Sequence, residues 1–215
     1  MLLVVSFNMK LFHLILFPFL CLCSLPMISC GQESEAEVST VLIDAESKAL
    51  IDAARWQIGK TVSYDPAYVA LSYPGGDIPI DKGVCTDVVI RALRKGRKMD
   101  LQKLVHEDMK QNFSLYPKIW KLKRPDKNID HRRVPNLQTY FKRKGWSLPV
   151  TQKAEDYQPG DLVTCLVNGN LPHIMIVSDK VSADGTPLCI HNIGGGTQEE
   201  DSLFSFKLTG HYRIK

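Results

Sequence analysis

The chain has 215 residues and a formal net charge of +4, with 23% charged and 44% hydrophobic residues. These fractions are ordinary for a globular protein, and the length fits one domain once a leader is set aside. The small excess of positive charge is too weak to indicate a nucleic-acid partner.

The first thirty residues have the pattern of a bacterial lipoprotein signal. Lys10 precedes an apolar run over residues 11–25, which is short for a membrane span of ~20 residues. The segment ends in a stretch, 27–31, that resembles a lipobox around Cys30. We expect residues 1–30 to be a signal peptide with Cys30 lipidated, anchoring a periplasm-facing protein in the membrane. An ordinary signal peptide or an uncleaved anchor is the alternative.

Residues 31–41 are rich in Gln, Glu and Ser and predict a polar tether. A single domain is then expected over residues 42–215. Its first half shows apolar residues at helical spacing, with Gly59, Gly96 and Gly145 placed as stop signals. The predicted helices cover residues 42–58, about 85–95, 100–109 and 135–144.

The second half changes to short β runs separated by turn residues. The predicted strands cover residues 161–167, 173–179, 187–192 and 210–214. Helices followed by an antiparallel meander define an α+β domain.

Residues 112–134 show no clear period and form a basic insertion. From residue 118 to 144 there are ten Lys or Arg against two Asp. The segment is either a solvated basic face or a contact for an anionic polymer or lipid head groups.

Cys85 is the leading candidate for chemistry, because it lies at the start of the second predicted helix. Unpaired N–H groups there favour an anion, and we therefore expect the thiol to lose its proton more easily than usual. A thiolate nucleophile needs a base and a group that orients the base. His173 opens an otherwise apolar strand and His191 lies on the next one, so antiparallel pairing would bring the two rings side by side.

Several stretches together carry a family resemblance. They are Tyr64, Cys85-Thr86-Asp87-Val88-Val89, Gln158-Pro159-Gly160-Asp161-Leu162-Val163, Pro172-His173-Ile174-Met175-Ile176-Val177 and Ile190-His191. This set resembles the NlpC-type papain-like cysteine hydrolases of bacterial cell walls. Residues 105–109, 128–137 and 210–213 further resemble an uncharacterised bacterial family known only as a domain of unknown function, DUF1287.

The resemblance implies a papain-like fold with Cys85 as nucleophile, His173 as base, His191 as orienting residue and Tyr64 beside the nucleophile. The chain departs from the NlpC pattern at Val84, where an Asp that holds the substrate amine is common. It also departs two residues after the base, where Gly is usual and this chain has Met175. We therefore expect a different substrate pocket.

Other residues are weaker candidates. His131, Arg132 and Arg133 could clamp a substrate carboxylate, or could belong to a structural network with Asp130. Asp87 is included among the candidate substrate-binding residues, and its first-turn position also suits the helix dipole. The stretch 106–108 lacks the second His of a zinc helix, so we expect neither metal nor cofactor.

Cys85, Cys165 and Cys189 remain after the leader cysteines are set aside. If the strands of Cys165 and Cys189 flank that of His173, they lie ~10 Å apart, beyond the ~7 Å limit for a disulfide. We expect three free thiols.

The sequence thus predicts a monomeric, secreted cysteine hydrolase that cleaves an amide bond in the cell envelope. Peptidoglycan stem peptide is the substrate that the resemblance implies. Two alternatives remain open: a non-catalytic module that binds envelope glycan or lipid on the same fold, and a thiol acyltransferase. An apolar groove beside Cys85 would favour the acyltransferase.

Overall fold

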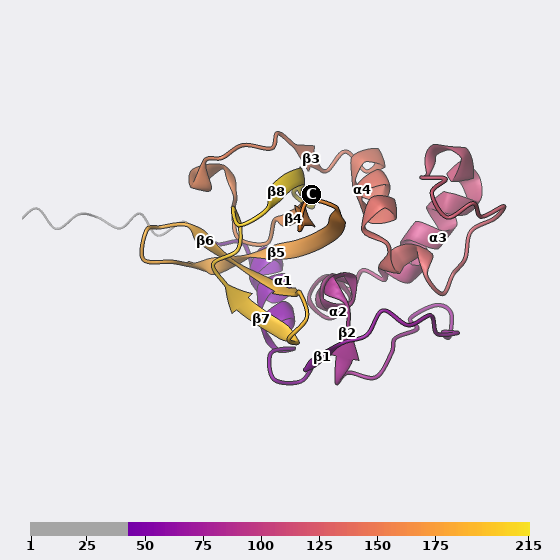
Figure 1. Ribbon diagram of the computed structural model, residues 1–215, viewed down its shortest axis with the longest axis horizontal. Coiled ribbons are helices and arrows are strands. Elements are labelled where there is room, and N and C mark those ends of the chain that lie inside the picture. Colours follow the sequence, from indigo (N-terminus) through magenta and orange to yellow (C-terminus); the bar gives the residue numbers. More distant parts are fainter. Residues whose placement is uncertain (1–42) are drawn as a thin grey trace, which may run out of the picture. The chain divides into compact units, whose positions relative to one another are not determined.

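An antiparallel sheet in the strand order β3-β8-β4-β5-β6-β7 is the main element of this computed structural model, which describes residues 43–215 (Figure 1). The predicted signal peptide, Cys30 and the tether lie outside the described residues. The strands are β3 (Ser147–Leu148), β4 (Leu162–Val167), β5 (Leu171–Val181), β6 (Pro187–Asn192), β7 (Thr197–Glu200) and β8 (Lys207–Tyr212). A separate parallel pair joins β1 (Ser63–Tyr64) to β2 (Lys82–Gly83).

The α-helices of the described chain precede the strands of the main sheet, as the sequence predicts. They are α1 (Ala45–Arg55), α2 (Cys85–Arg97), α3 (Leu101–Asn112) and α4 (Val134–Arg143), with short 3₁₀ helices η1 (Phe113–Leu115), η2 (Asp130–Arg132) and η3 (Ala154–Asp156). Asp100 caps α3, since its carboxylate accepts from the N–H of Gln102. The α+β expectation is confirmed.

Gly96 is not the stop signal that the sequence suggests, because α2 continues through it to Arg97 and ends at Lys98 with a φ of 56°. A Cβ at Gly96 would lie 2.5 Å from the carbonyl oxygen of Ala49. Gly96 therefore permits the close approach of α1 and α2.

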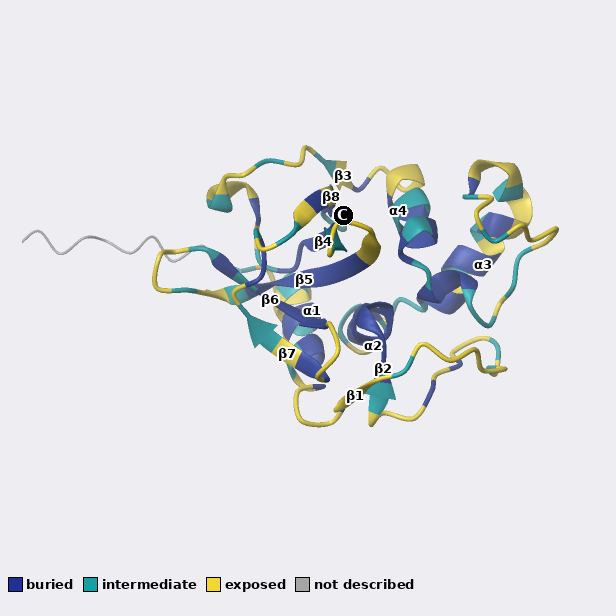
Figure 2. Ribbon diagram, viewed as in Figure 1, coloured by how far each residue is buried: buried dark blue, intermediate teal, exposed yellow. Residues whose placement is uncertain are grey.

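The apolar run of β5 is buried on both faces of the sheet, as Figure 2 shows. Ile174 and Ile176 belong to the core cluster that includes α1, α2 and α4. Met175 and Val177 belong to a second cluster with residues of β4 and β6. Successive strand residues point to opposite faces, so a continuous apolar run is what a strand covered on both sides requires. β5 is thereby a rigid support for His173.

Asp161 explains the Pro-Gly-Asp sequence that opens β4. Its buried carboxylate accepts hydrogen bonds of 2.7 Å from both His211 Nε2 and Arg213 Nε. The backbone N–H of Gln158 donates to the same carboxylate at 2.8 Å. These bonds fix β4 to β8 and to the loop before β4.

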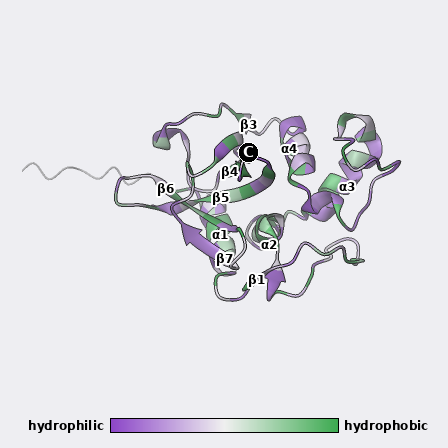
Figure 3. Ribbon diagram, in the orientation of Figure 1, coloured by the Kyte–Doolittle hydropathy of each residue, from purple (hydrophilic) through white to green (hydrophobic). Residues whose placement is uncertain are grey.

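β7 was not predicted from the sequence. Its residues, Thr-Gln-Glu-Glu, are polar and are coloured hydrophilic in Figure 3, where β7 lies at the sheet edge. Within the described residues, no helix is long and apolar enough to span a membrane.

Candidate active site

Cys85 is the first residue of α2 and its side chain is almost completely buried. The backbone N–H groups of Ile174 and Thr86 lie near the sulfur and favour its charged form. Ile174 directly follows His173, so the thiol lies against the start of β5. Burial nevertheless raises the pKa of the Cys85 thiol to about 11. The expectation of a lowered pKa was wrong, because loss of solvent outweighs the helix N-terminus and its N–H groups.

A buried ion pair holds the loop that carries Cys85. The Arg132 guanidinium donates to both Asp87 carboxylate oxygens, at 2.8 and 2.9 Å. Asp87 also accepts from the N–H of Val84 at 2.7 Å. Arg132 donates in addition to the carbonyl oxygens of Ala67 and Asp65. Since four bonds occupy a group with five N–H donors, Arg132 and Asp87 are placed to shape the loop rather than to contact a substrate.

His173 and His191 are brought together as the sequence predicts. His173 Nε2 lies 2.7 Å from His191 Nδ1, and both rings are buried. This contact leaves His173 Nδ1 as the ring nitrogen available to a thiol. Burial lowers the pKa of His173 to about 3, so its ring is neutral at ordinary pH. Within residues 43–215, no hydrogen bond joins His173 to Cys85. The raised pKa of the thiol and the lowered pKa of the imidazole leave both groups neutral at rest.

Glu200 and Ser202 are two site residues that sequence analysis missed. His191 Nε2 lies 3.0 Å from Glu200 Oε1 and 3.1 Å from Ser202 Oγ. The contacts run in a row from His173 through His191 to Glu200. The only signal in the sequence was the acidic pair that ends β7, whose pairing with β6 could not be foreseen.

Tyr64 lies near Cys85, as the resemblance implies. Burial, with the nearby Cys85 as a smaller cause, raises the pKa of the Tyr64 phenol to about 12. The hydroxyl therefore stays protonated and can donate a hydrogen bond. Together with the first N–H groups of α2, it can face an oxyanion formed at a carbonyl attacked by Cys85.

A groove of about 320 Å³ opens beside Cys85. Its lining is mostly apolar and comes from the β1 region, the α2 start, the basic insertion and the α4 start. Trp120 forms part of the wall, and the Arg133 guanidinium lies 4.2 Å from its ring centroid. The lining residues are Tyr64, Pro66, Val84, Cys85, Ile119, Trp120, Ile129, Arg132, Arg133, Val134, Pro135 and Pro172.

The basic insertion thus forms one wall of this groove, while its lysines at 118, 121, 123 and 127 are exposed. Arg133 lines the groove and also pairs with Asp130 at 3.3 Å. His131 is buried, does not line the groove, and has a pKa lowered to about 4 by burial. Of the three residues considered for a carboxylate clamp, Arg133 is placed best for that role.

The cysteine prediction is confirmed for the described residues, because Cys85, Cys165 and Cys189 are all free. Cys165 on β4 pairs with His173, and Cys189 on β6 pairs with Val177, so their strands flank β5. Within residues 43–215 no group of three or more His, Cys, Asp or Glu is arranged to hold a metal ion.

Comparison with known proteins gives three findings. The family described as "Domain of unknown function (DUF1287)" matches residues 51–214. "Uncharacterized protein YijF" of Escherichia coli (strain K12) is 61% identical over 165 residues, which cover 77% of this chain and 80% of that protein. The solved structure of NlpC1 from Trichomonas vaginalis is similar at a TM-score of 0.40 and 14% identity, over 80% of this chain. The match spans 45% of the length of that structure.

Proposed function

Since the chain belongs to the DUF1287 family, which is defined without a function, we propose its activity from its own site: a cysteine hydrolase that cleaves an amide bond. The observations that carry this proposal are the row formed by His173, His191 and Glu200, and the position of Cys85 at a helix start with its sulfur near the backbone N–H of Ile174, the residue after His173. The NlpC-type resemblance of the sequence around the same residues supports it.

In the proposed mechanism, the Cys85 sulfur attacks the amide carbonyl as His173 Nδ1 accepts the thiol proton. Because Nδ1 of the neutral His173 ring is the base, its Nε2–H donates to His191 Nδ1, which keeps the ring oriented, and the Glu200 carboxylate stabilises the positive charge that develops on the two rings. The backbone N–H of Cys85 and the Tyr64 hydroxyl stabilise the oxyanion. His173 then gives the proton to the leaving amine, and a thioester with Cys85 remains.

Water completes the cycle. His173 takes a proton from the attacking water, the carbon–sulfur bond breaks, and the carboxylic acid leaves as the Cys85 thiol regains its proton. The neutral resting pair fits this route, because the base must accept the thiol proton during attack rather than before substrate binds.

The proposed substrate is the stem peptide of peptidoglycan, reached by a protein exported and anchored through Cys30. This substrate rests on the resemblance and on the expected compartment. Arg133, which lines the groove with a partly exposed guanidinium, would hold a peptide carboxylate.

One observation favours a second candidate, thiol acyl transfer. The groove beside Cys85 is lined mainly by Pro, Ile, Val and Trp side chains, which suits an acyl chain better than a charged peptide. The first chemical step would be the same, but an alcohol or amine would replace water as the acceptor of the acyl group.

The test uses the chain from Gly31 onward and a Cys85→Ala control, both incubated with purified peptidoglycan sacculi. Mass spectrometry of the soluble fraction would identify new muropeptides from the intact protein and none from the control, and their masses would name the bond. No products from either protein, with both cosedimenting with sacculi, would replace the hydrolase by a binding module.

A further inference from the structure

The tip of the basic insertion, residues 118–124, combines exposed positive charge with exposed apolar side chains. It contains four Lys or Arg and no acidic residue, so its net charge equals the +4 of the whole chain. The N–H of Lys121 donates to the carbonyl oxygen of Lys118 at 2.9 Å, which closes a turn. Apart from Trp120, every residue of this insertion tip is exposed.

Large aliphatic side chains are held in solvent at the insertion tip and beside it. Ile119 is 67% exposed, the highest value among the large hydrophobic residues of the described chain, and Leu122 is 37% exposed. Leu115, on η1 three residues before the tip, is 59% exposed. Single exposed apolar residues are common, but three of them within residues 115–122 indicate a surface that binds a partner.

Three cations of the insertion tip have no partner within the protein. Within residues 43–215, the side chains of Lys121, Lys123 and Arg124 have no carboxylate within 4.0 Å and no hydrogen-bond acceptor. Lys118 differs, because its Nζ donates to the carbonyl oxygen of Phe113 at 2.6 Å. The charges of the other three are therefore available to an external anion.

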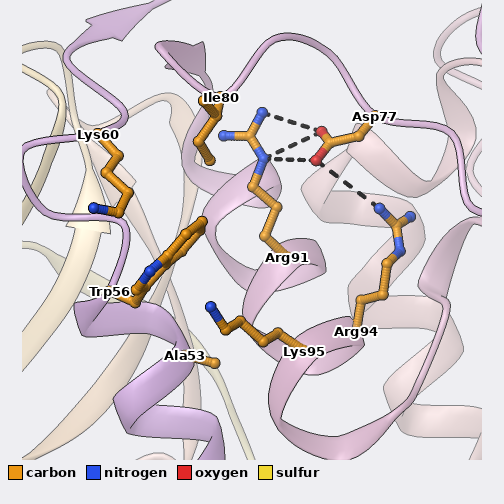
Figure 4. Close-up of a pocket in the computed structure, with 8 residues that line it drawn as sticks. All are labelled: Ala53, Trp56, Lys60, Asp77, Ile80, Arg91, Arg94 and Lys95. Carbon is orange, nitrogen blue, oxygen red and sulfur yellow. Dashed lines mark hydrogen bonds and ion pairs between the residues drawn. The ribbon is translucent and has the colours of Figure 1, made fainter.

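Figure 4 shows a contrasting basic region, at a pocket beside α1 and α2, whose cations are engaged within the protein. Arg91 pairs with Asp77 at 2.9 Å. Lys95 Nζ lies 3.5 Å and Lys60 Nζ 5.1 Å from the ring centroid of Trp56, so both lysines make cation–π contacts. What distinguishes the insertion tip is thus its three unpartnered cations rather than positive charge alone.

We propose that the insertion tip binds the surface of an anionic lipid bilayer. Lys121, Lys123 and Arg124 face the lipid phosphates, and Ile119 and Leu122 enter the head-group layer. A bilayer surface acts over a Debye length of about 8 Å at physiological ionic strength. The cations therefore need no fixed distance from one another, as they would to hold a single small anion.

A bilayer suits the insertion tip better than a soluble anionic polymer does. A glycan or another water-soluble polyanion would neutralise the cations but would leave Ile119 and Leu122 in water. A bilayer offers both an anionic surface and an apolar interior directly beneath it. Basic and apolar residues alternate along the tip, so both kinds of contact are made by the same short segment.

This contact has a consequence for the groove at Cys85. Ile119 and Trp120 of the insertion tip also line that groove. Binding of the tip to a bilayer would therefore bring the mouth of the groove to the membrane surface. The inference goes beyond the proposed function, because membrane binding does not require Cys85 to react.

The test measures binding of the chain from Gly31 onward, which contains the compact unit Val41–Lys215. This chain lacks Cys30, so no attached lipid contributes to binding. Cosedimentation is measured at about 0.15 M salt with phosphatidylcholine vesicles that contain about 30 mol% phosphatidylglycerol, and with vesicles of phosphatidylcholine alone. The chain should bind the anionic vesicles at least about tenfold more tightly than the neutral ones.

Two double variants separate the charged from the apolar contribution. Lys121→Gln/Lys123→Gln should weaken binding at least about tenfold, because each cation near an anionic bilayer contributes about fivefold. Ile119→Ser/Leu122→Ser should weaken it at least about fivefold through the loss of apolar burial.

Matched controls make the same changes on exposed residues elsewhere. Lys153→Gln/Lys207→Gln and Val150→Ser/Val181→Ser should both bind as the unchanged chain does. Cys85→Ala should also bind normally, so that failure of the proposed hydrolase and failure of membrane binding are seen separately.

Three results would overturn the proposal. They are no preference for the anionic vesicles, including no binding at all, an equal loss in a control variant, and undiminished binding of Ile119→Ser/Leu122→Ser. The last result would assign the tip to soluble polyanions instead of a bilayer.

Discussion

The rate at which Cys85 is alkylated should rise steeply with pH, because its thiol is neutral at rest. Its pKa is raised from the ordinary 9.0 to about 11. A difference of two units means about a hundredfold less thiolate at neutral pH than an exposed cysteine has. Only thiolate reacts with iodoacetamide, so the rate constant should increase about tenfold per pH unit between pH 7 and 10.

The assay follows carboxamidomethylation of Cys85 by peptide mass spectrometry, which separates it from Cys165 and Cys189. Burial raises the pKa of both these thiols to about 12, and they should react more slowly still. His173→Ala should leave the pH profile unchanged, since no ion pair with His173 lowers the Cys85 pKa. A rate that is flat from pH 5 to 8 and becomes pH-dependent in His173→Ala would refute this reasoning, because it would reveal a thiolate–imidazolium pair.

Three further predictions concern the polar contacts. Glu200→Gln should lower kcat about tenfold with little change in KM, because the carboxylate acts on His191 and not on substrate. Arg132→Ala should destabilise the fold by about 3–5 kcal/mol in urea unfolding, since it leaves Asp87 charged and buried. Hydrogen bonds from Arg55, Ser178 and Lys180 hold the pKa of the Glu199 carboxyl at about 2, below the ordinary 4.5. The stability that these bonds contribute is present above pH 4.5 and is lost as the pH falls toward 2. Arg55→Gln should flatten that acid limb of the stability curve by on the order of 1–2 kcal/mol.

The first two of these predictions have a matched control variant. Asp201→Asn removes a neighbouring exposed carboxylate and should leave kcat unchanged; an equal fall would assign the Glu200 effect to general charge. Arg133→Ala removes a partly exposed guanidinium and should cost far less stability than Arg132→Ala. For Arg55, an acid limb that is unaltered in the variant would show that Glu199 does not titrate through this contact.

The row of site residues could be predicted only as far as its members carry a local pattern. Cys85 lies at the start of a helix with an apolar stripe, and His173 and His191 lie at the ends of apolar strands. These local patterns predict the order Cys85, His173, His191 for the candidate site. Glu200 belongs to a polar edge strand with no apolar alternation, and its contact depends on the pairing of β7 with β6. Such pairing is a tertiary property that a single sequence does not reveal.

The burial of the Cys85 side chain also could not be predicted from the sequence. The sequence indicates that a helix starts at Cys85. The packing of the Cys85 sulfur near the N–H of Ile174, however, joins positions far apart in the chain. The same holds for Arg132 and Asp87, which are 45 residues apart and form a buried bidentate pair. A basic segment can therefore be assigned neither to solvent nor to substrate until its partners are known.

The central claim, that Cys85 is a nucleophile served by His173, is tested most directly by trapping the acylated protein. The chain from Gly31 onward is mixed with p-nitrophenyl acetate, quenched in acid within seconds and analysed by intact-mass and peptide mass spectrometry. The account predicts one acetyl group on Cys85, none in Cys85→Ala, and a rate lower by at least about a hundredfold in His173→Ala. Acetylation of Cys85→Ala at an undiminished rate, or a rate in His173→Ala equal to that of the unchanged chain, would contradict it.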